Sequence, residues 1–122
     1  MRVIAGKLKG RRLAAVEGLH TRPTADRVRE ALFNILGPKP RDAIVLDLFA
    51  GTGALGIEAL SRGARKAFFV DYAKQAVSVV RKNIQHCGLD TAAQIIKWDI
   101  AKNLNCLKGY EQIFNLVFMD PP

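Results

Sequence analysis

The chain has 122 residues, of which 49% are hydrophobic and 25% charged, so it has enough apolar material for one folded domain. No apolar run approaches the roughly 20 residues of a membrane span, and the N-terminus lacks the apolar segment of a signal peptide. Cys87 and Cys106 fit no disulfide or metal-ligand spacing, and His20 and His86 lie far from a second plausible ligand. We therefore expect a cytoplasmic protein with reduced thiols, no metal site and no membrane association.

The net charge of +8 is unevenly distributed along the chain. Residues 1–41 hold ten Lys or Arg against three Asp or Glu, whereas residues 42–122 hold nine against eight. A short, strongly basic segment favours docking on a polyanion, and nucleic acid explains it better than a merely solvated basic face. We predict a basic N-terminal extension (1–41) followed by a core (42–122).

Residues 1–16 predict a β-hairpin or ribbon, because short apolar stretches flank the turn between Gly6 and Gly10. An irregular connection follows, and a helix is expected from Thr24 to Gly37, with an apolar stripe formed by Val28, Ala31, Leu32, Ile35 and Leu36. Basic side chains on such elements can follow phosphates without reading sequence. The candidates for this role are Lys7, Lys9, Arg11, Arg12, Arg22, Arg27 and Arg29.

The segment from Ile44 to Glu58 combines a continuous apolar run, a glycine turn and a helical pattern. Such an order is typical of a buried parallel strand that leads through a tight turn into a helix. Further strands are expected at 66–71, 93–98 and 115–119, with helices between them. This alternation predicts an α/β fold with a parallel sheet of Rossmann-like type and helices on both faces.

Each predicted strand ends on or next to a carboxylate, namely Asp47, Asp71, Asp99 and Asp120. Parallel sheets bind ligands outside the carboxyl ends of their strands, so we expect these acids to share one rim. Gly51, Gly53 and Gly56 also fit the dinucleotide pattern G-x-G-x-x-G, with Asp71 in the position of the ribose-binding acid. Asp47 argues against that interpretation, because it would repel a pyrophosphate at the same turn. A ligand with a positive charge there, such as S-adenosylmethionine, fits better than a buried Asp that only caps its own turn.

Several motifs together resemble a known family: DLFAGTG (47–53), FVD (69–71), WDI (98–100) and DPP (120–122), with RVIAGKLKGRRL (2–13) and RPTADRVREALFN (22–34). They are similar to the class I S-adenosylmethionine-dependent methyltransferases, and the two N-terminal segments narrow the resemblance to the bacterial RsmD family. That family methylates the exocyclic N2 amine of a guanine in 16S ribosomal RNA. The resemblance covers nearly the whole chain, and it implies that 16S rRNA or a small-subunit assembly particle is the partner.

The resemblance also implies residue roles. Asp47 and the turn at 50–53 would hold the methionine part of the cofactor, Asp71 the ribose hydroxyls, and Asp99 the adenine amine with Ile100 beside it. The implied cofactor-binding residues are Asp47, Phe49, Ala50, Gly51, Gly53, Asp71, Tyr72, Asp99 and Ile100, and the catalytic element is Asp120, Pro121 and Pro122.

Two other interpretations stay open. An NAD-type dinucleotide domain would explain the glycines and Asp71, and a non-catalytic RNA-binding module could share the fold. The family continues beyond DPP with an aromatic residue and further strands and helices. We therefore expect the core at 42–122 to be incomplete at its C-terminal end and, by itself, inactive.

Overall fold

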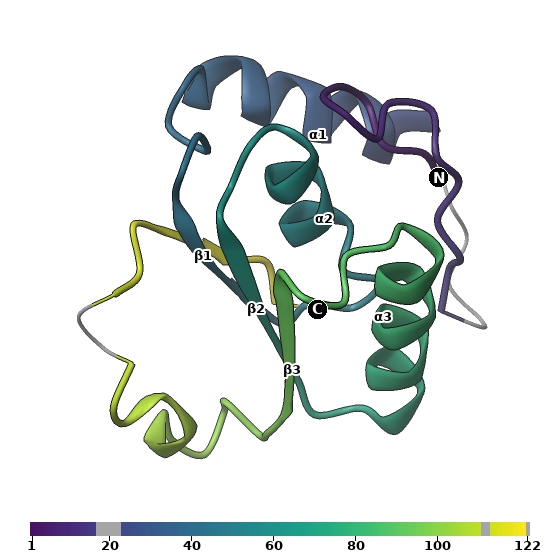
Figure 1. The fold of residues 1–122 in the computed structure, drawn as a ribbon. Helices are drawn as coiled ribbons and strands as arrows, with labels where there is room; N and C mark the ends of the chain where they lie inside the picture. Colours follow the sequence, from purple (N-terminus) through teal and green to yellow (C-terminus); the bar gives the residue numbers. More distant parts are fainter. Residues whose placement is uncertain (17–22, 111–112, 122) are drawn as a thin grey trace.

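The fold centres on a four-stranded parallel sheet (Figure 1). The structure is a computed structural model that describes residues 1–16, 23–110 and 113–121. The strands are β1 (Ile44–Leu48), β2 (Lys66–Asp71), β3 (Ala93–Lys97) and β4 (Leu116–Met119), in the order β3-β2-β1-β4. The helices are α1 (Pro23–Leu36), α2 (Ala54–Ser61) and α3 (Lys74–His86), with a short 3-10 helix, η1 (Asn105–Leu107). The predicted parallel α/β fold is confirmed.

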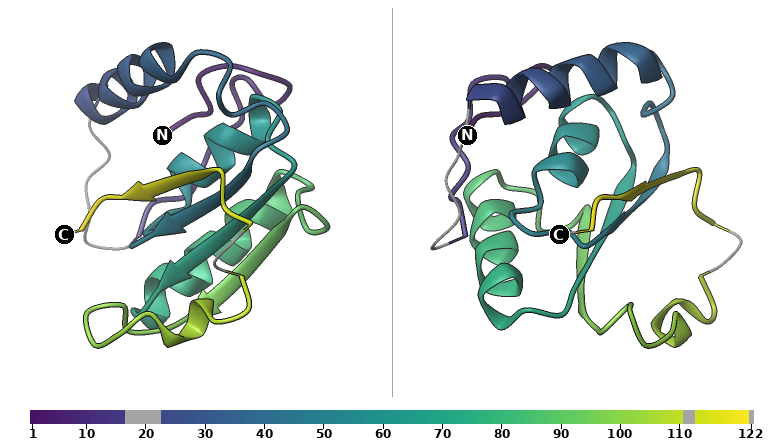
Figure 2. Two further views of the ribbon diagram at one scale, coloured as in Figure 1. Left: turned by 90° about the vertical axis from the view of Figure 1, so that its left-hand side faces the viewer. Right: turned by 180° about the vertical axis from the view of Figure 1, so that it is seen from behind.

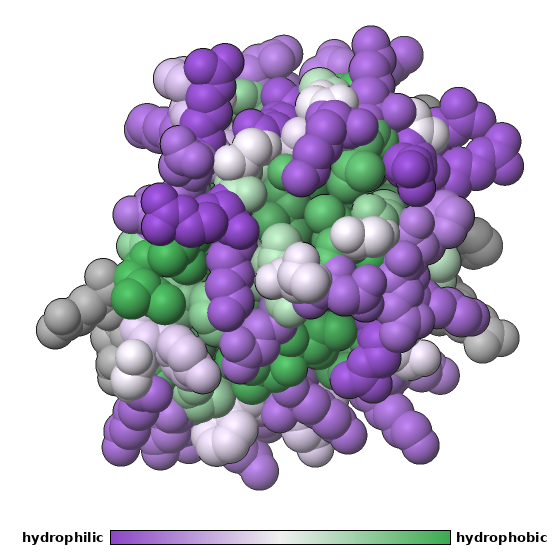
Figure 3. Space-filling model, viewed as in Figure 1, coloured by the Kyte–Doolittle hydropathy of each residue, from purple (hydrophilic) through white to green (hydrophobic). Residues whose placement is uncertain are grey.

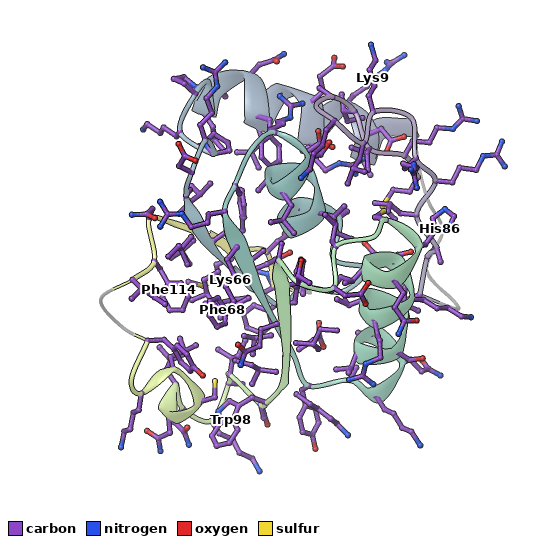
Figure 4. The ribbon with its side chains drawn as sticks, viewed as in Figure 1. Lys9, Lys66, Phe68, His86, Trp98 and Phe114 are labelled. Carbon is purple, nitrogen blue, oxygen red and sulfur yellow. The ribbon has the colours of Figure 1, made fainter. Side chains whose placement is uncertain are left out.

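Alternation along the strands divides the apolar residues into two clusters, one on each face of the sheet. On one face, Val45 and Phe69 pack with residues of all three α-helices. On the other face, Leu46 and Phe68 pack against η1 and the segment around it, and the Phe68 ring meets the Phe114 ring edge-on at 5.3 Å (Figure 4). Strands β1 and β2 are therefore buried on both sides, as their continuous apolar runs predict.

The helices cover the sheet less evenly than expected from the sequence. In the described part of the chain, α1, α2 and α3 all pack into the same cluster, and the views in Figure 2 place η1 across the sheet from α2 and α3. The physical reason is that the β1-α2-β2-α3-β3 crossovers run in one direction with one hand. The connection from β3 to β4 crosses the second face, and its described residues include the 3-10 helix η1. None of the described helices is long and apolar enough to span a membrane.

Helix α1 turns a different side to the core from the one its apolar stripe predicts. Phe33 is 1% exposed and Arg29 is 5% exposed, whereas Val28 and Ile35 are 62% and 83% exposed. Burial of Arg29 follows from its ion pair with Glu58 of α2, at 3.5 Å. The helix is thus oriented by a charged contact together with one aromatic ring.

The N-terminal ribbon (residues 1–16) is an antiparallel turn, reduced to an isolated bridge between Arg2 and Arg12. It lies directly on α2: the N–H groups of Ile4 and Ala5 donate to the buried carboxylate of Glu58 at 2.9 and 3.1 Å. Gly6 has φ +85°, and a Cβ at that position would lie 2.0 Å from the carbonyl oxygen of Ser61, so only glycine allows this approach.

Residues from both predicted segments share one hydrophobic cluster. Val3, Leu13 and Phe33 of the segment 1–41 pack with β1, α2 and α3 of the segment 42–122. The change in charge near residue 41 is therefore not a boundary in the packing.

Candidate active site

The site lies where the sheet reverses its strand order. Strands β2 and β3 follow β1 on one side, and β4 returns to its other side, so the carboxyl ends of β1 and β4 flank the switch point. A cleft of about 520 Å³ opens there, within the range of small-molecule sites. Its lining includes Phe49, Ala50, Gly51, Thr52, Asp71 and Asp120, with Met1, Ala15, Val16 and Ala25 on the N-terminal side.

Most N–H groups of the glycine turn donate to acceptors inside the protein. Gly53 has φ 82° and forms the N-cap of α2, and Gly51 has φ 60°. Six N–H groups of this turn donate internally, those of Ala50, Gly51, Gly53, Ala54, Gly56 and Ile57. Free N–H groups at such a turn would be available to a ligand. The structure instead shows them directed into the turn and onto two carboxylates.

Gly56, the last glycine of the pattern, serves the packing of α2 on the sheet. A Cβ at this position would lie 2.3 Å from Cε1 of Phe69 in β2. The third glycine therefore brings helix and strand together and does not line the cleft.

Asp47 is buried beneath the turn, with 1% of its surface exposed. Its Oδ2 accepts a hydrogen bond from the N–H of Gly56 at 3.0 Å. Burial raises the pKa of Asp47 from 3.8 to about 8, and the charges of Asp120 and Asp71 act in the same direction. Asp47 was predicted to face a cation, but it is absent from the cleft lining and holds the start of α2 instead.

Asp71 lies at the end of β2 and lines the cleft. Its Oδ2 accepts from the N–H of Gly51 at 2.9 Å, and its Oδ1 accepts from the N–H of Ala73 at 3.0 Å. These two bonds orient the carboxylate and leave lone pairs on both oxygens, since an ionised carboxylate has about four acceptor sites. Asp71 is therefore a preoriented acceptor on the cleft wall.

Asp120 follows β4 and borders two hollows at once. It lines the cleft and also a second, contiguous hollow of about 790 Å³ between α1 and β4. The two hollows share Met1, Ala25, Ala54, Leu55 and Asp120. Pro121 is exposed beside Asp120, and Pro122 lies outside the described residues.

Phe49 is a cleft residue with an unusual backbone, since its φ of 55° is rare for a bulky side chain. Such a conformation costs about 1–3 kcal/mol and is held by its surroundings. It sets the path of the chain from β1 into the glycine turn.

Five of the predicted cofactor residues lie outside the cleft lining, namely Asp47, Gly53, Tyr72, Asp99 and Ile100. Asp99 accepts from the N–H of Ala101 at 3.1 Å and shapes its own turn. Ile100 packs against the cluster on the second face of the sheet, and Tyr72 is 63% exposed. The four strand-end acids thus follow one rim of the sheet, but only Asp71 and Asp120 line this cleft.

The predicted phosphate-contacting residues separate into two groups. Lys7, Lys9, Arg11, Arg12 and Arg27 are exposed. Arg29 is not: it is buried, pairs with Asp26 at 3.1 Å and with Glu58 at 3.5 Å, and donates to the carbonyl of Arg2. Its prediction as an RNA contact is therefore wrong, because the guanidinium is committed to the interior. Arg22 lies outside the described residues.

Two buried polar residues that organise the site were missed by the sequence analysis. Glu58 is 0% exposed and joins the N-terminal ribbon, α1 and α2. Asn83 is 2% exposed, donates to the carbonyl of Thr52 at 2.8 Å and bonds Ala14 through both ends of its amide. The signal for Glu58 was a lone charge within the apolar helix ALGIEALS, whereas nothing distinguished Asn83 on the polar helix α3.

The Rossmann-like parallel sheet and the acid-lined cleft at its switch point place this protein in the class of methyltransferase-like α/β proteins. A solved structure of a hypothetical protein from Thermus thermophilus has a TM-score of 0.84 and 33% identity, covering 100% of this chain and 69% of that one. A structure described as a methyltransferase complexed with SAH gives a TM-score of 0.69 at 25% identity, over 87% of this chain and 28% of that one.

The family follows from a match over all residues of this chain. The family model described as "Conserved hypothetical protein 95" matches residues 1–122, and this chain belongs to that family, the RsmD family indicated by its motifs. The Haemophilus influenzae protein "Ribosomal RNA small subunit methyltransferase D" is 40% identical over 126 residues, covering 100% of this chain and 63% of that protein. The chain spans 60–66% of the length of the first curated relatives it matches.

Proposed function

We propose that this chain forms the cofactor-binding core of an S-adenosylmethionine-dependent methyltransferase that acts on the exocyclic N2 amine of a guanine in 16S ribosomal RNA. The observation that carries the proposal is the acidic cleft at the switch point, with Asp71 and Asp120 on its walls and Asp47 beneath its floor. Asp71 and Asp120 both lie close enough to Asp47 for their charges to raise its pKa, so a positive charge in the cleft would relieve the repulsion among these groups and favours a cationic ligand.

The donor pattern of the turn separates this cofactor from a dinucleotide. A pyrophosphate needs free N–H groups and a positive field at the start of the helix. Here the N–H of Gly51 already donates to Asp71 and the N–H of Gly56 to Asp47. These N–H groups are therefore not free for phosphates, and the carboxylate of Asp71 adds negative charge at the cleft wall, so the turn suits a sulfonium and an ammonium better than two phosphates.

The protein's own groups have distinct roles in this proposal. Asp71 would accept both ribose hydroxyls, and the turn at 50–53 would contact the methionine part. Asp99 would accept from the adenine amine, with Ile100 and Tyr72 nearby. The bound cofactor supplies an electrophilic methyl group. The Haemophilus relative's name and the SAH complex of the methyltransferase neighbour support this assignment.

Asp120 and the prolines after it would act on the nucleophile. A guanine amine is a poor nucleophile, because its lone pair is delocalised into the ring. Asp120 lies between the cleft and the second hollow, where its carboxylate can accept an N–H of a base and so orient the lone pair. Pro121 and Pro122 would restrict the backbone that carries this acceptor.

The basic ribbon supports an RNA substrate. Lys7, Lys9, Arg11 and Arg12 are exposed on a segment whose end, Ala15 and Val16, forms part of the cleft wall. Cations on this ribbon can hold an RNA backbone while the target base leaves its stack to reach Asp120. We place the reaction in the cytoplasm, on 16S rRNA or on a small-subunit assembly particle.

The test is methyl transfer from labelled S-adenosylmethionine by the full-length protein. Unmodified 16S rRNA and small-subunit particles are incubated separately, and the labelled nucleotide is mapped. Label on the N2 amine of one guanine is the expected result. RNA binding without label would indicate a non-catalytic RNA-binding module, and binding of NAD in place of S-adenosylmethionine would indicate the dinucleotide domain.

A further inference from the structure

A groove separates the N-terminal ribbon from α3, on the side of the molecule where Figure 4 labels Lys9 and His86. It has a volume of about 370 Å³. Arg12 lines it from the ribbon, and Lys82 and His86 line it from α3, one helical turn apart. Leu13, Ala14 and Asn83 complete its lining, so no carboxylate borders it among the described residues.

No ion pair within the described part of the chain neutralises Arg12 or Lys82 at this groove. The ion pairs found among residues 1–16, 23–110 and 113–121 all involve Asp26 or Glu58, and neither Arg12 nor Lys82 takes part in them. Arg11 adds a further charge, since its Nη1 donates to the carbonyl of His86 at 3.3 Å. Like charges that face each other across a groove repel, and an anion between them removes that cost.

The sequence around the groove is free of acids over two separate stretches. Residues 1–16 contain no Asp or Glu, and neither do residues 72–89, which include all of α3. Figure 3 shows hydrophilic side chains along the upper and right-hand outline of the molecule, over the ribbon and α3. Residues 42–122 contain nearly equal numbers of basic and acidic residues, so their total charge does not reveal this second basic surface.

Asn83 makes the groove a fixed structure and connects it to the cleft. Its Nδ2 donates to the carbonyls of Ala14 and Thr52, at 3.0 and 2.8 Å, and its Oδ1 accepts from the N–H of Ala14 at 2.7 Å. Ala14 lines the groove, and Ala15 and Val16 line the cleft. The two sites are thus separated by one or two residues of chain, roughly 7 Å when extended.

We propose that this groove binds a backbone phosphate of the same RNA strand whose base enters the cleft. Lys82 and Arg12 supply the charge, and the exposed His86 supplies a ring N–H donor. The inference rests on the proposed function, since it assumes an RNA substrate. It adds α3 to the RNA-binding surface, with Lys82 as the contact that the N-terminal ribbon alone does not provide.

The experiment measures binding of a 16S rRNA transcript to the full-length protein at several salt concentrations. The variants are Lys82→Gln, Arg12→Gln and the double variant, with Arg81→Gln as the matched control. Arg81 is exposed, adjacent in α3 and equally charged, but it borders a different hollow, together with Asp90. Its substitution removes the same net charge from the same helix without touching the groove.

Lys82→Gln is expected to weaken RNA binding about fivefold at low salt and to reduce the slope of log K against log salt by about 0.7. Arg81→Gln should leave that slope unchanged. The double variant should lose less than the sum of the single losses, because both cations hold one phosphate. Equal effects of Lys82→Gln and Arg81→Gln, or strictly additive losses, would overturn the proposal.

Failure of this inference is distinguishable from failure of the proposed function. If the unmodified protein transfers label to RNA and Lys82→Gln matches Arg81→Gln, the groove is no phosphate site and the methyltransferase assignment stands. If the unmodified protein binds S-adenosylmethionine but neither binds nor labels RNA, the RNA substrate itself is excluded.

Discussion

Asp47 and Gly56 meet across the turn that joins β1 to α2, where Oδ2 of Asp47 accepts the N–H of Gly56 at 3.0 Å. The carboxyl group is 1% exposed, so it satisfies an unpaired donor of the helix start inside the protein. The contact fixes the glycine turn from below, while Asp71 holds Gly51 from the cleft side. Two acids therefore determine the shape of the proposed cofactor site, and only one of them lines the cleft.

The buried Asp47 should make stability fall as pH rises. With its pKa raised to about 8, the folded protein keeps a proton that the unfolded chain releases above about 4. The free energy of unfolding should therefore decrease between about pH 4 and 8, by at most about 1.4 kcal/mol per pH unit, and level off outside that window. Urea unfolding of Asp47→Asn at each pH should show a flatter profile. The exposed Asp42→Asn serves as control and should retain the full slope.

Asp71→Ala should weaken S-adenosylmethionine binding about 10- to 100-fold, because it removes a charged acceptor from the cleft wall and releases the N–H groups of Gly51 and Ala73. Isothermal titration calorimetry measures the loss. Asp71→Asn retains an acceptor and should lose less. The exposed Asp90→Asn, beyond α3, provides the baseline, and an affinity for Asp71→Ala equal to that baseline would remove Asp71 from the site.

Asp120→Ala should reduce methyl transfer by about 100-fold or more while cofactor affinity stays nearly intact. Asp120 borders both hollows, so its carboxylate can accept an N–H of a base that enters between them. Single-turnover transfer to RNA and calorimetric cofactor affinity are measured on the same preparation. Substantial residual transfer would show that the amine is oriented by another group.

Glu58→Ala should destabilise the fold by about 3–5 kcal/mol, because it removes the buried one of the two carboxylates that pair with the buried Arg29. It also removes the acceptor of the N–H groups of Ile4 and Ala5, which hold the basic ribbon on α2. Urea denaturation measures the change. Glu30→Ala, an exposed acid on α1, should lie within about 0.5 kcal/mol of the unmodified protein. Similar values for the two variants would contradict the structural role of Glu58.

The match between predicted and observed elements depends on how local each signal is. The strand predicted at 66–71 is β2 (Lys66–Asp71), and the strands predicted at 93–98 and 115–119 differ from β3 and β4 by one residue at one end. Continuous apolar runs and glycine stops are properties of the chain itself, so they can be read without knowledge of partners. Strand-end acids were located for the same reason.

Helix α1 shows that a local sequence pattern does not determine which side of a helix is buried. Its apolar stripe predicted that Val28 and Ile35 would be buried, yet both are exposed, and Arg29 is buried in their place. The side of α1 that faces the core is set by Glu58, which lies 29 residues further along the chain. Its buried charge requires a partner, and Arg29 provides one. An ion pair between two helices produces no periodic pattern in the sequence of either helix.

The amino-acid sequence by itself determined the order of strands and helices, the acids at the strand ends and the concentration of positive charge near the N-terminus, since these depend on neighbouring residues alone. Only the tertiary structure decided which side chains reach the cleft. It buried Asp47 and Arg29, brought the N-terminal ribbon to the cleft wall, and set Lys82 opposite Arg12. Exposure and charge pairing are set by contacts between residues far apart in the chain, and those contacts exist only once the sheet and its helices have packed.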